Sequence, residues 1–451
     1  MWQEGLHYHA NAQGISAMED EDYVTLSEDK AKVTRLSILS SLSRVTRSFI
    51  HVALPLFVLA IGQTESFYGI MVAAAGYVQA VILFPAGIFS DKEGRGLSIM
   101  VGGIFSGLCY LLIPFATDTL LILILYALTG IGSGFASTSV SALVADYTEK
   151  GEERTKSYGI TITAATLTAM IGSFLAGFIL DPAALPGINP EMARFAIVFF
   201  IVGGTGFATG LYGYYTDKWL HSNHKKIGWR TEEESFETGH TTEHDTKTAI
   251  LFGATQTIMG FSSGMVIPYL IPWINAAFTP DPVILGSIPA ISSITLATGT
   301  LFVGLQSERV GKLRMIFLLY LFAPILMFGL VYAPFFLLMV GFYITRMAAA
   351  NMARPATNSL FMGEISGLRR GRSWAIIRIA WTFSRQTGTL LTSFILGAGV
   401  VGGMVAYGQI LFPLAMVLYP ISVIPMYIAV RRNSNRIEDH DTSIPFQTSD
   451  E

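Results

Sequence analysis

The sequence predicts an all-α membrane protein with twelve transmembrane helices arranged as two parallel six-helix bundles. Hydrophobic residues make up 51% of its 451 residues and charged residues only 14%, whereas about a quarter of the residues in soluble chains are charged. The mean hydropathy is +0.51. In addition, a polar turn between two apolar stretches recurs 217 residues later with glycines, acids and bases at matching positions. We therefore expect a duplicated membrane unit.

The apolar stretches define the expected helices, because one crossing of the hydrocarbon layer needs about 20 residues. A polar, acidic tail over 1–34 comes first, and a charge-alternating linker over 216–247 separates an N-terminal bundle (35–215) from a C-terminal bundle (248–430). A second tail covers 431–451. We expect the N-terminal tail to be solvated and irregular. The twelve expected helices lie near 36–61, 66–89, 97–115, 119–146, 157–180, 193–215, 248–274, 283–305, 313–332, 335–360, 373–397 and 402–429.

The distribution of lysine and arginine predicts the orientation of these helices. Basic residues gather in the turns after the second, fourth, eighth and tenth helices, in the linker and in the C-terminal tail. The turns after odd-numbered helices contain acids such as Glu65 and Asp118, and Arg194 is their single basic residue. By the positive-inside rule, both termini and the linker face the cytoplasm. We expect a multi-pass protein of the plasma membrane whose two halves have the same orientation.

The repeated turn contains residue types that suit a connection between two closely packed helices. Gly87 allows helices to approach closely, Gly94 allows a positive φ angle, and Asp91 can accept hydrogen bonds at a helix end. The same offset relates Gly69 to Gly286 and Pro55 to Pro272. The first copy contains Gly87, Asp91, Lys92, Gly94 and Arg95, and the weaker second copy contains Gly304, Glu308, Arg309, Gly311 and Lys312.

This Gly-x-x-x-Asp-Lys-x-Gly-Arg turn and its copy, placed after the second and eighth helices, resemble the major facilitator superfamily over about residues 35–430. The resemblance implies the fold of that superfamily. It also implies secondary active transport by alternating access, in which two six-helix bundles rock about a site near the middle of the bilayer.

The resemblance further implies that the turn is a conformational gate, a set of charges that closes the cytoplasmic side when the transporter faces outward. Asp146 occupies the place of the acid that pairs with Arg95, and Arg154 follows it. Glu364 and Arg370 are the corresponding residues of the second half. The alternative is that these are ordinary loop charges that satisfy the positive-inside rule.

Ionisable residues inside the expected helices are all basic, and each costs about 2.5–3.5 kcal/mol in the hydrocarbon layer. They are Arg44, Arg47, His51, Arg346, Arg354, Arg378 and Arg385. Arg44, Arg354 and Arg378 lie near enough to the boundary to extend into the headgroups. Arg346 and Arg385 are more central. They either bond to carbonyl and hydroxyl groups of neighbouring helices, or bind an anion through their guanidinium groups.

Two transport functions are open. The leading hypothesis is a carrier of a small organic or inorganic anion, and the alternative is an exporter of amphipathic drugs or other hydrophobic compounds, lined by Tyr343, Met347, Trp381 and Phe383. His51 is either the carrier of a coupling proton or a hydrogen-bonded packing residue. The fourth helix has Tyr126 and Thr129 where proton-coupled relatives often have Arg and Gln, which weakens the case for a proton-driven drug exporter. The predicted cavity residues are Arg47, His51, Arg346, Arg385, Trp381 and Gln256.

A membrane enzyme is the least favoured class. Catalysis needs a nucleophile beside a base, or a set of metal ligands, and the helices offer only Cys109 and His51. We expect no enzymatic activity, no cofactor and no metal, and no basic patch suggests nucleic acid. The expected partners are a small-molecule substrate, a proton as candidate coupling ion and the lipid bilayer, with a monomer as the functional unit.

Overall fold

The computed structural model describes residues 4–147, 152–188, 191–223, 241–364 and 370–441, and every regular element among them is a helix. Side chains are described for these ranges except 4–29, 145, 152–158, 241–245, 297–310, 312, 354–355, 358–359, 362–376 and 433–441.

The N-terminal half contains six long helices, as the apolar pattern predicts. They are α1 (Glu4–Ala60), α2 (Glu65–Glu93), α3 (Arg95–Leu112) with the short η1 (Ile113–Phe115), α4 (Thr119–Asp146), α5 (Glu152–Leu180) and α6 (Glu191–Asn223). Their ends follow local signals, because Thr64 and Asp118 cap α2 and α4 by accepting hydrogen bonds from backbone N–H groups. α1 differs from our expectation: it runs on through the acidic tail, which is helical from Glu4 and not irregular.

The C-terminal half repeats this layout with two interrupted helices. Its elements are α7 (Thr241–Val266), η2 (Ile267–Tyr269), α8 (Leu270–Phe278), α9 (Pro282–Val310), α10 (Lys312–Val331), α11 (Phe336–Glu364), α12 (Arg370–Gly397), α13 (Met404–Met416) and α14 (Leu418–Asp441). Pro268 lies in η2, where its missing N–H removes a backbone hydrogen bond and interrupts the helix between α7 and α8. The expected seventh helix is therefore α7–η2–α8 and the twelfth is α13–α14, so that the chain crosses the membrane twelve times.

Ten of these crossings are long and apolar enough to span a membrane on the described residues alone. The other two are α9 and α12. The described apolar part of α9 is limited to Pro282–Leu296. In α12, Arg378 and Arg385 and several hydroxyl residues lower the mean hydropathy.

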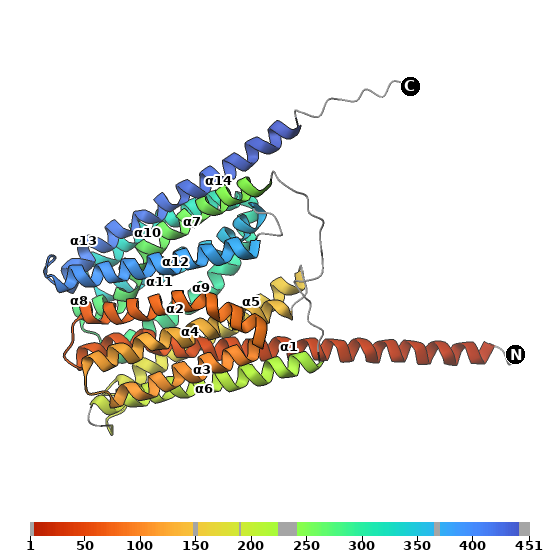
Figure 1. The fold of residues 1–451 in the computed structure, drawn as a ribbon, viewed down its shortest axis with the longest axis horizontal. Helices are drawn as coiled ribbons and strands as arrows, with labels where there is room; N and C mark the ends of the chain where they lie inside the picture. The colour runs from red at the N-terminus through yellow and green to blue at the C-terminus, as the bar shows by residue number, and fades with distance from the viewer. Residues whose placement is uncertain (1–3, 148–151, 189–190, 224–240, 365–369, 442–451) are drawn as a thin grey trace.

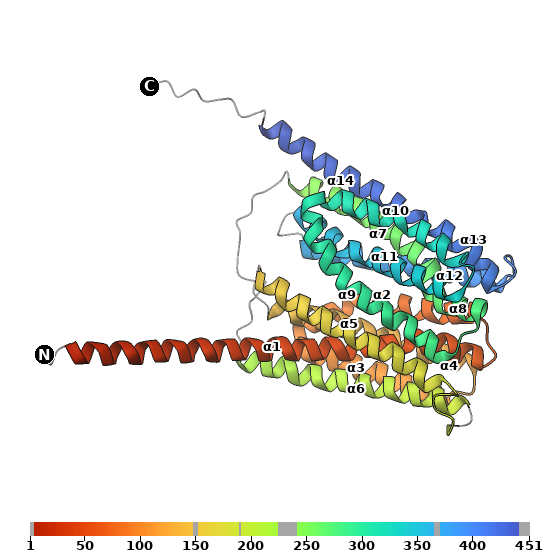
Figure 2. The same cartoon turned by 180° about the vertical axis from the view of Figure 1, so that it is seen from behind.

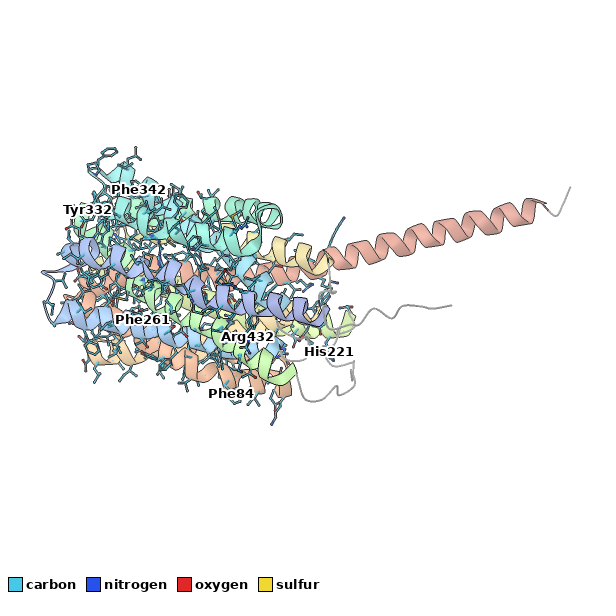
Figure 3. The ribbon with its side chains drawn as sticks, turned by 90° about the horizontal axis from the view of Figure 1, so that it is seen from above. Phe84, His221, Phe261, Tyr332, Phe342 and Arg432 are labelled. Carbon is cyan, nitrogen blue, oxygen red and sulfur yellow. The ribbon has the colours of Figure 1, made fainter. Side chains whose placement is uncertain are left out.

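The helices pack into two bundles that meet along two helix pairs. α2 packs against α12, and α5 packs against α9. In Figure 1 the bundles diverge toward the side at which both chain ends lie, and the view from behind in Figure 2 shows the same divergence. We call this the termini side and the other end of the helices the opposite side. In Figure 3, Arg432 and His221 lie toward the termini side and Tyr332 lies at the opposite side.

The residues related by the 217-residue offset have equivalent roles in the two halves. Gly69 of α2 packs against Tyr269 and Ser393, so that a methyl group there would collide with α12. A methyl group on its counterpart Gly286 would lie 2.5 Å from the carbonyl oxygen of Ser173 on α5. Both glycines therefore permit close contact between the halves on the opposite side.

Within the C-terminal half, α7 and α12 approach closely through another glycine. A methyl group on Gly264 would overlap the carbonyl oxygen of Arg385. Because that atom is part of the backbone, no side-chain movement relieves the overlap, and the two helices would have to separate.

This contact yields a stability prediction. We expect Gly264→Ala to destabilise the protein by about 1–3 kcal/mol through overpacking and to lower its thermal unfolding midpoint in detergent. Gly253 on the same helix is the control, since the nearest atom to a methyl group there is 4.0 Å away. Gly253→Ala should leave the midpoint unchanged or raise it, because alanine favours a helix by about 1 kcal/mol. Equal midpoints for the two variants would contradict the close α7–α12 contact.

Candidate functional site

The turn between α2 and α3 depends on a positive φ angle. Gly94 ends α2 and precedes α3 with φ at 107°, a conformation that other residues adopt only with strain. Its counterpart Gly311, between α9 and α10, has φ at 92°. The duplicated turn therefore keeps the same backbone bend in both halves, although its side chains differ.

Arg95 connects the ends of three helical segments at this turn. Its Nε donates a hydrogen bond to Asp146 Oδ2 of α4 over 3.1 Å, and its Nη1 donates to Ser90 Oγ of α2 over 3.2 Å. Nη1 also forms an ion pair with Asp91. The Arg95 and Asp146 side chains are 20% and 17% exposed, whereas Asp91 is 65% exposed. The Arg95–Asp146 pair is therefore shielded from solvent, which strengthens it relative to surface pairs.

A chain of hydroxyl groups continues from Arg95 into the bundle. The Ser139 hydroxyl of α4 lies 2.9 Å from that of Ser90 and 2.7 Å from that of Ser98 on α3, and all three residues are buried. These contacts fix the relative positions of α2, α3 and α4 at the turn.

Asp217 of α6 is a part of this turn that sequence reasoning missed. Its Oδ2 accepts a hydrogen bond from the Gly96 N–H over 2.7 Å, at the start of α3, where a helix favours negative charge. Burial raises the pKa of the nearby Tyr147 phenol, and the charges of Asp217 and Asp146 raise it further. The signal in the sequence was an acid near the end of the sixth apolar stretch.

The remaining predicted gate residues are placed as follows. Gly87 lies in α2 with open space around it, and Lys92 is exposed. The other side chains lie outside the described residues: Arg154, Gly304, Glu308, Arg309, Lys312, Glu364 and Arg370.

Arg385 of α12 faces the N-terminal half. It is close enough to interact electrostatically with His51 of α1, Tyr68 of α2 and Tyr126 of α4. Its guanidinium carbon lies 5.5 Å from the centre of the Trp381 ring, within the range of a cation–π contact. Arg385 therefore brings a positive charge from one half against a histidine and two tyrosines of the other.

Arg47 of α1 adds a second positive charge to this region, from the N-terminal half. It is exposed, and it interacts electrostatically with Tyr110 and Tyr126. His51, one helical turn further along α1, is half-buried. Trp381 and Gln256 of α7 are also half-buried, and the predicted cavity residues other than Arg346 are thus all at least partly accessible.

Arg346 lies in a different environment. Its side chain is fully buried, and its two Nη atoms contact the sulfur atoms of Met347 and Met416 at 3.0 and 3.1 Å. Met416 ends α13, so the guanidinium lies inside the C-terminal bundle between α11 and α13. Its Nε has no hydrogen-bond partner. Of the two roles predicted for Arg346, bonding to neighbouring helices fits these contacts, and anion binding stays a prediction.

The tyrosines near Arg385 are the second group that sequence reasoning missed. Tyr68 donates a hydrogen bond from its hydroxyl to the Pro268 carbonyl oxygen over 3.0 Å and so connects α2 to η2 across the two halves. Tyr126 and Tyr110 pack edge to face with ring centres 6.4 Å apart. A tyrosine in an apolar helix must satisfy its hydroxyl, but no spacing in the sequence indicates that three of them converge.

Comparison with known proteins agrees with this architecture. A family model described as Major Facilitator Superfamily matches residues 36–239. An uncharacterized MFS-type transporter of Methanocaldococcus jannaschii is 22% identical over 359 residues, which cover 77% of this chain and 86% of that protein.

Two solved structures share the fold. A crystal structure of a bacterial homolog to the human lysosomal transporter Spinster, in an inward-facing and occupied conformation, has a TM-score of 0.69 at 16% identity and covers 88% of this chain and 96% of that one. A mutant of the nucleoside transporter NupG has a TM-score of 0.69 at 12% identity and covers 88% and 100%. The family model shows that residues 36–239 of this multi-pass membrane protein belong to the major facilitator superfamily of transporters, and the solved structures show that the chain as a whole has the same fold.

Proposed function

We propose that this transporter carries a small organic or inorganic anion across the plasma membrane by alternating access, with both termini and the linker in the cytoplasm. The observation that carries the proposal is the position of Arg385, whose charge is near enough to His51, Tyr68 and Tyr126 of the other half to interact with them electrostatically. A ligand bound there contacts both halves at once, as a ligand must if it is to couple their movement.

The charges around this region favour an anion. In the described membrane-spanning segments, acidic residues lie near the segment ends, as with Asp91 and Glu191. Arg385 and Arg47 contribute positive charge to this part of the membrane-spanning region. Such charges attract an anion more strongly in an apolar environment than in water, and guanidinium groups bind carboxylate or phosphate through two parallel hydrogen bonds.

The remaining predicted cavity residues fit supporting roles. His51 is the candidate carrier of a coupling proton because imidazole is the side chain whose ordinary pKa lies nearest neutral pH. Trp381 holds the Arg385 guanidinium from the same helix. Gln256 offers an amide on the α7 side. We assign Arg346 to the packing of α11 against α13 and not to the anion.

The turn at Arg95 is proposed as the gate of the termini side. In this conformation Phe84 of α2 is 68% exposed, about two helical turns beyond Gly76, which packs against Gln386 of α12. Rotation of the halves would cover Phe84 and bring the exposed Asp91 toward the C-terminal half. The Arg95–Asp146 pair keeps the turn rigid through that movement.

An exporter of amphipathic or hydrophobic compounds is the weaker candidate. Of its four predicted contacts, Trp381 and Phe383 are accessible, but Tyr343 is fully buried and Met347 is in contact with Arg346 inside the C-terminal bundle.

The first functional prediction concerns Arg385. The transported anion is first identified by a thermal-shift screen of the purified protein against carboxylates, phosphate and sulfate. A bound anion at 100 times its Kd raises the free energy of unfolding by about 2.7 kcal/mol. Uptake of that anion into proteoliposomes should fall about 100-fold in Arg385→Gln, and less in Arg385→Lys, which keeps the charge without the planar fork.

Two controls accompany this experiment. Arg378→Gln removes an exposed arginine on the same face of α12 and should leave uptake within about twofold of the wild type. Arg346→Met should lower thermal stability while folded protein keeps its anion affinity. Unchanged uptake in Arg385→Gln, or equal losses of affinity at Arg385 and Arg346, would contradict the assignment.

The second functional prediction concerns the gate. Arg95→Gln and Asp146→Asn should each slow transport about tenfold, because each leaves the remaining charged residue of a shielded ion pair without its partner. The double variant should be no slower than either single variant, which corresponds to a coupling of about 1–2 kcal/mol. Glu93→Gln, an exposed change at the same turn, is the control and should transport normally. Additive losses in the double variant would show that the two residues act independently.

A further inference from the structure

A groove on the outer surface of the C-terminal half lies between α10 and α14, away from the region between the halves. Its cavity volume is about 440 Å³. Residues of α10 from Leu313 to Leu318 form one wall, and residues of α14 from Pro420 to Tyr427 form the other. Nothing in the proposed transport cycle uses this groove.

The groove opens onto a surface that faces lipid. Exposed apolar side chains flank it, among them Phe322 and Ile325 of α10 and Ile421 and Ile428 of α14. In a membrane protein such a surface contacts acyl chains, and a concave part of it holds a chain more firmly than a flat part does.

The two helices run antiparallel, and one ring contact sets their register. The Tyr320 and Tyr419 rings pack edge to face with centres 5.5 Å apart. Counting back along α10 and forward along α14 places Arg314 and Tyr427 together at the termini-side end of the groove, with Pro420 at the deep end. At a rise of about 1.5 Å per residue, the wall from Tyr427 to Pro420 is about 10 Å long.

Positive charge is concentrated at the termini-side end. Arg314 is the one charged side chain among the lining residues, and it is exposed. Arg431 follows Tyr427 by four residues, so it continues the same face of α14, and it is also exposed. Arg432 is exposed too, but it is turned about 100° further around the helix.

We propose that this groove binds an anionic glycerophospholipid from the leaflet on the termini side. One acyl chain occupies the groove, and the phosphate is held by Arg314 and Arg431. A guanidinium pair at the membrane boundary matches the charge and the oxygen geometry of a phosphate, and Tyr427 lies at the depth where aromatic rings meet headgroups. The lipid is a bound component of the transporter and not its cargo, so this proposal is independent of the transported substrate.

Native mass spectrometry of the full chain in detergent tests this proposal. Phosphatidylglycerol and phosphatidylcholine with identical acyl chains are the probes. We expect phosphatidylglycerol to bind about tenfold more tightly, and Arg314→Gln with Arg431→Gln to remove that preference. Arg432→Gln is the matched control, since it removes the same charge one residue away, and it should keep the preference. Arg431→Gln alone, at an exposed position, should weaken the preference if the double variant does not fold.

A second variant tests the groove itself. Ile424→Trp fills part of it from an exposed position and should weaken binding of both lipids, with an unchanged thermal midpoint as evidence of folding. The proposal is overturned if Arg432→Gln loses the preference as fully as the double variant. Two further results would also overturn it: equally tight binding of glycerol 3-phosphate, which has no acyl chain, or a dimer that covers the groove and excludes lipid.

Discussion

Close backbone contact between the halves on one side of the membrane is the constraint on which the rest of this structure depends. Gly69 brings α2 against α12, and Gly177 and Gly286 bring α5 against α9. Lipid supplies no hydrophobic force between helices, so such contacts must come from close packing and from hydrogen bonds. The hydroxyls of Ser66 and Tyr68 donate hydrogen bonds between the halves in the same region. With that side closed, the divergence of the bundles toward the termini side follows.

The arginines Arg95, Arg385 and Arg346 occupy three different environments. Arg95 is shielded and paired with acids, which makes it a fixed structural charge at the turn. Arg385 is partly accessible and interacts electrostatically with His51, Tyr68 and Tyr126 of the other half, and we propose it as the anion ligand. Arg346 is enclosed by thioethers within one bundle. An arginine in or near the membrane is costly, and each of these three offsets that cost through different partners. Only the partners of its guanidinium distinguish one arginine from another.

The sequence was sufficient to predict the helix order, the division into halves and the bend of the turn. Hydropathy determines where a chain crosses a membrane. The duplication shows that Gly94 and Gly311 occupy equivalent positions in the two halves, as do Gly69 and Gly286. The sequence was not sufficient to predict the interruption between α13 and α14, or the different environments of Arg346 and Arg385. Both arginines are central in their helices, and the difference between them depends on how each helix is rotated in its bundle. The role of Asp217 could not be predicted either, because it depends on the end of α6 lying beside the start of α3.

Distances between spin labels on the two halves test the central account most directly. In a Cys109→Ser background, one pair replaces Phe84 and Ile379 on the termini side, and the other replaces Thr64 and Val400 on the opposite side. Gly286→Leu, which obstructs the α5–α9 contact, should lengthen the Thr64–Val400 distance and shorten the Phe84–Ile379 distance. Gly341→Leu, at a glycine with open space around it, should change neither. If both distances move in the same direction or stay fixed in Gly286→Leu, the two halves do not rock about a shared site.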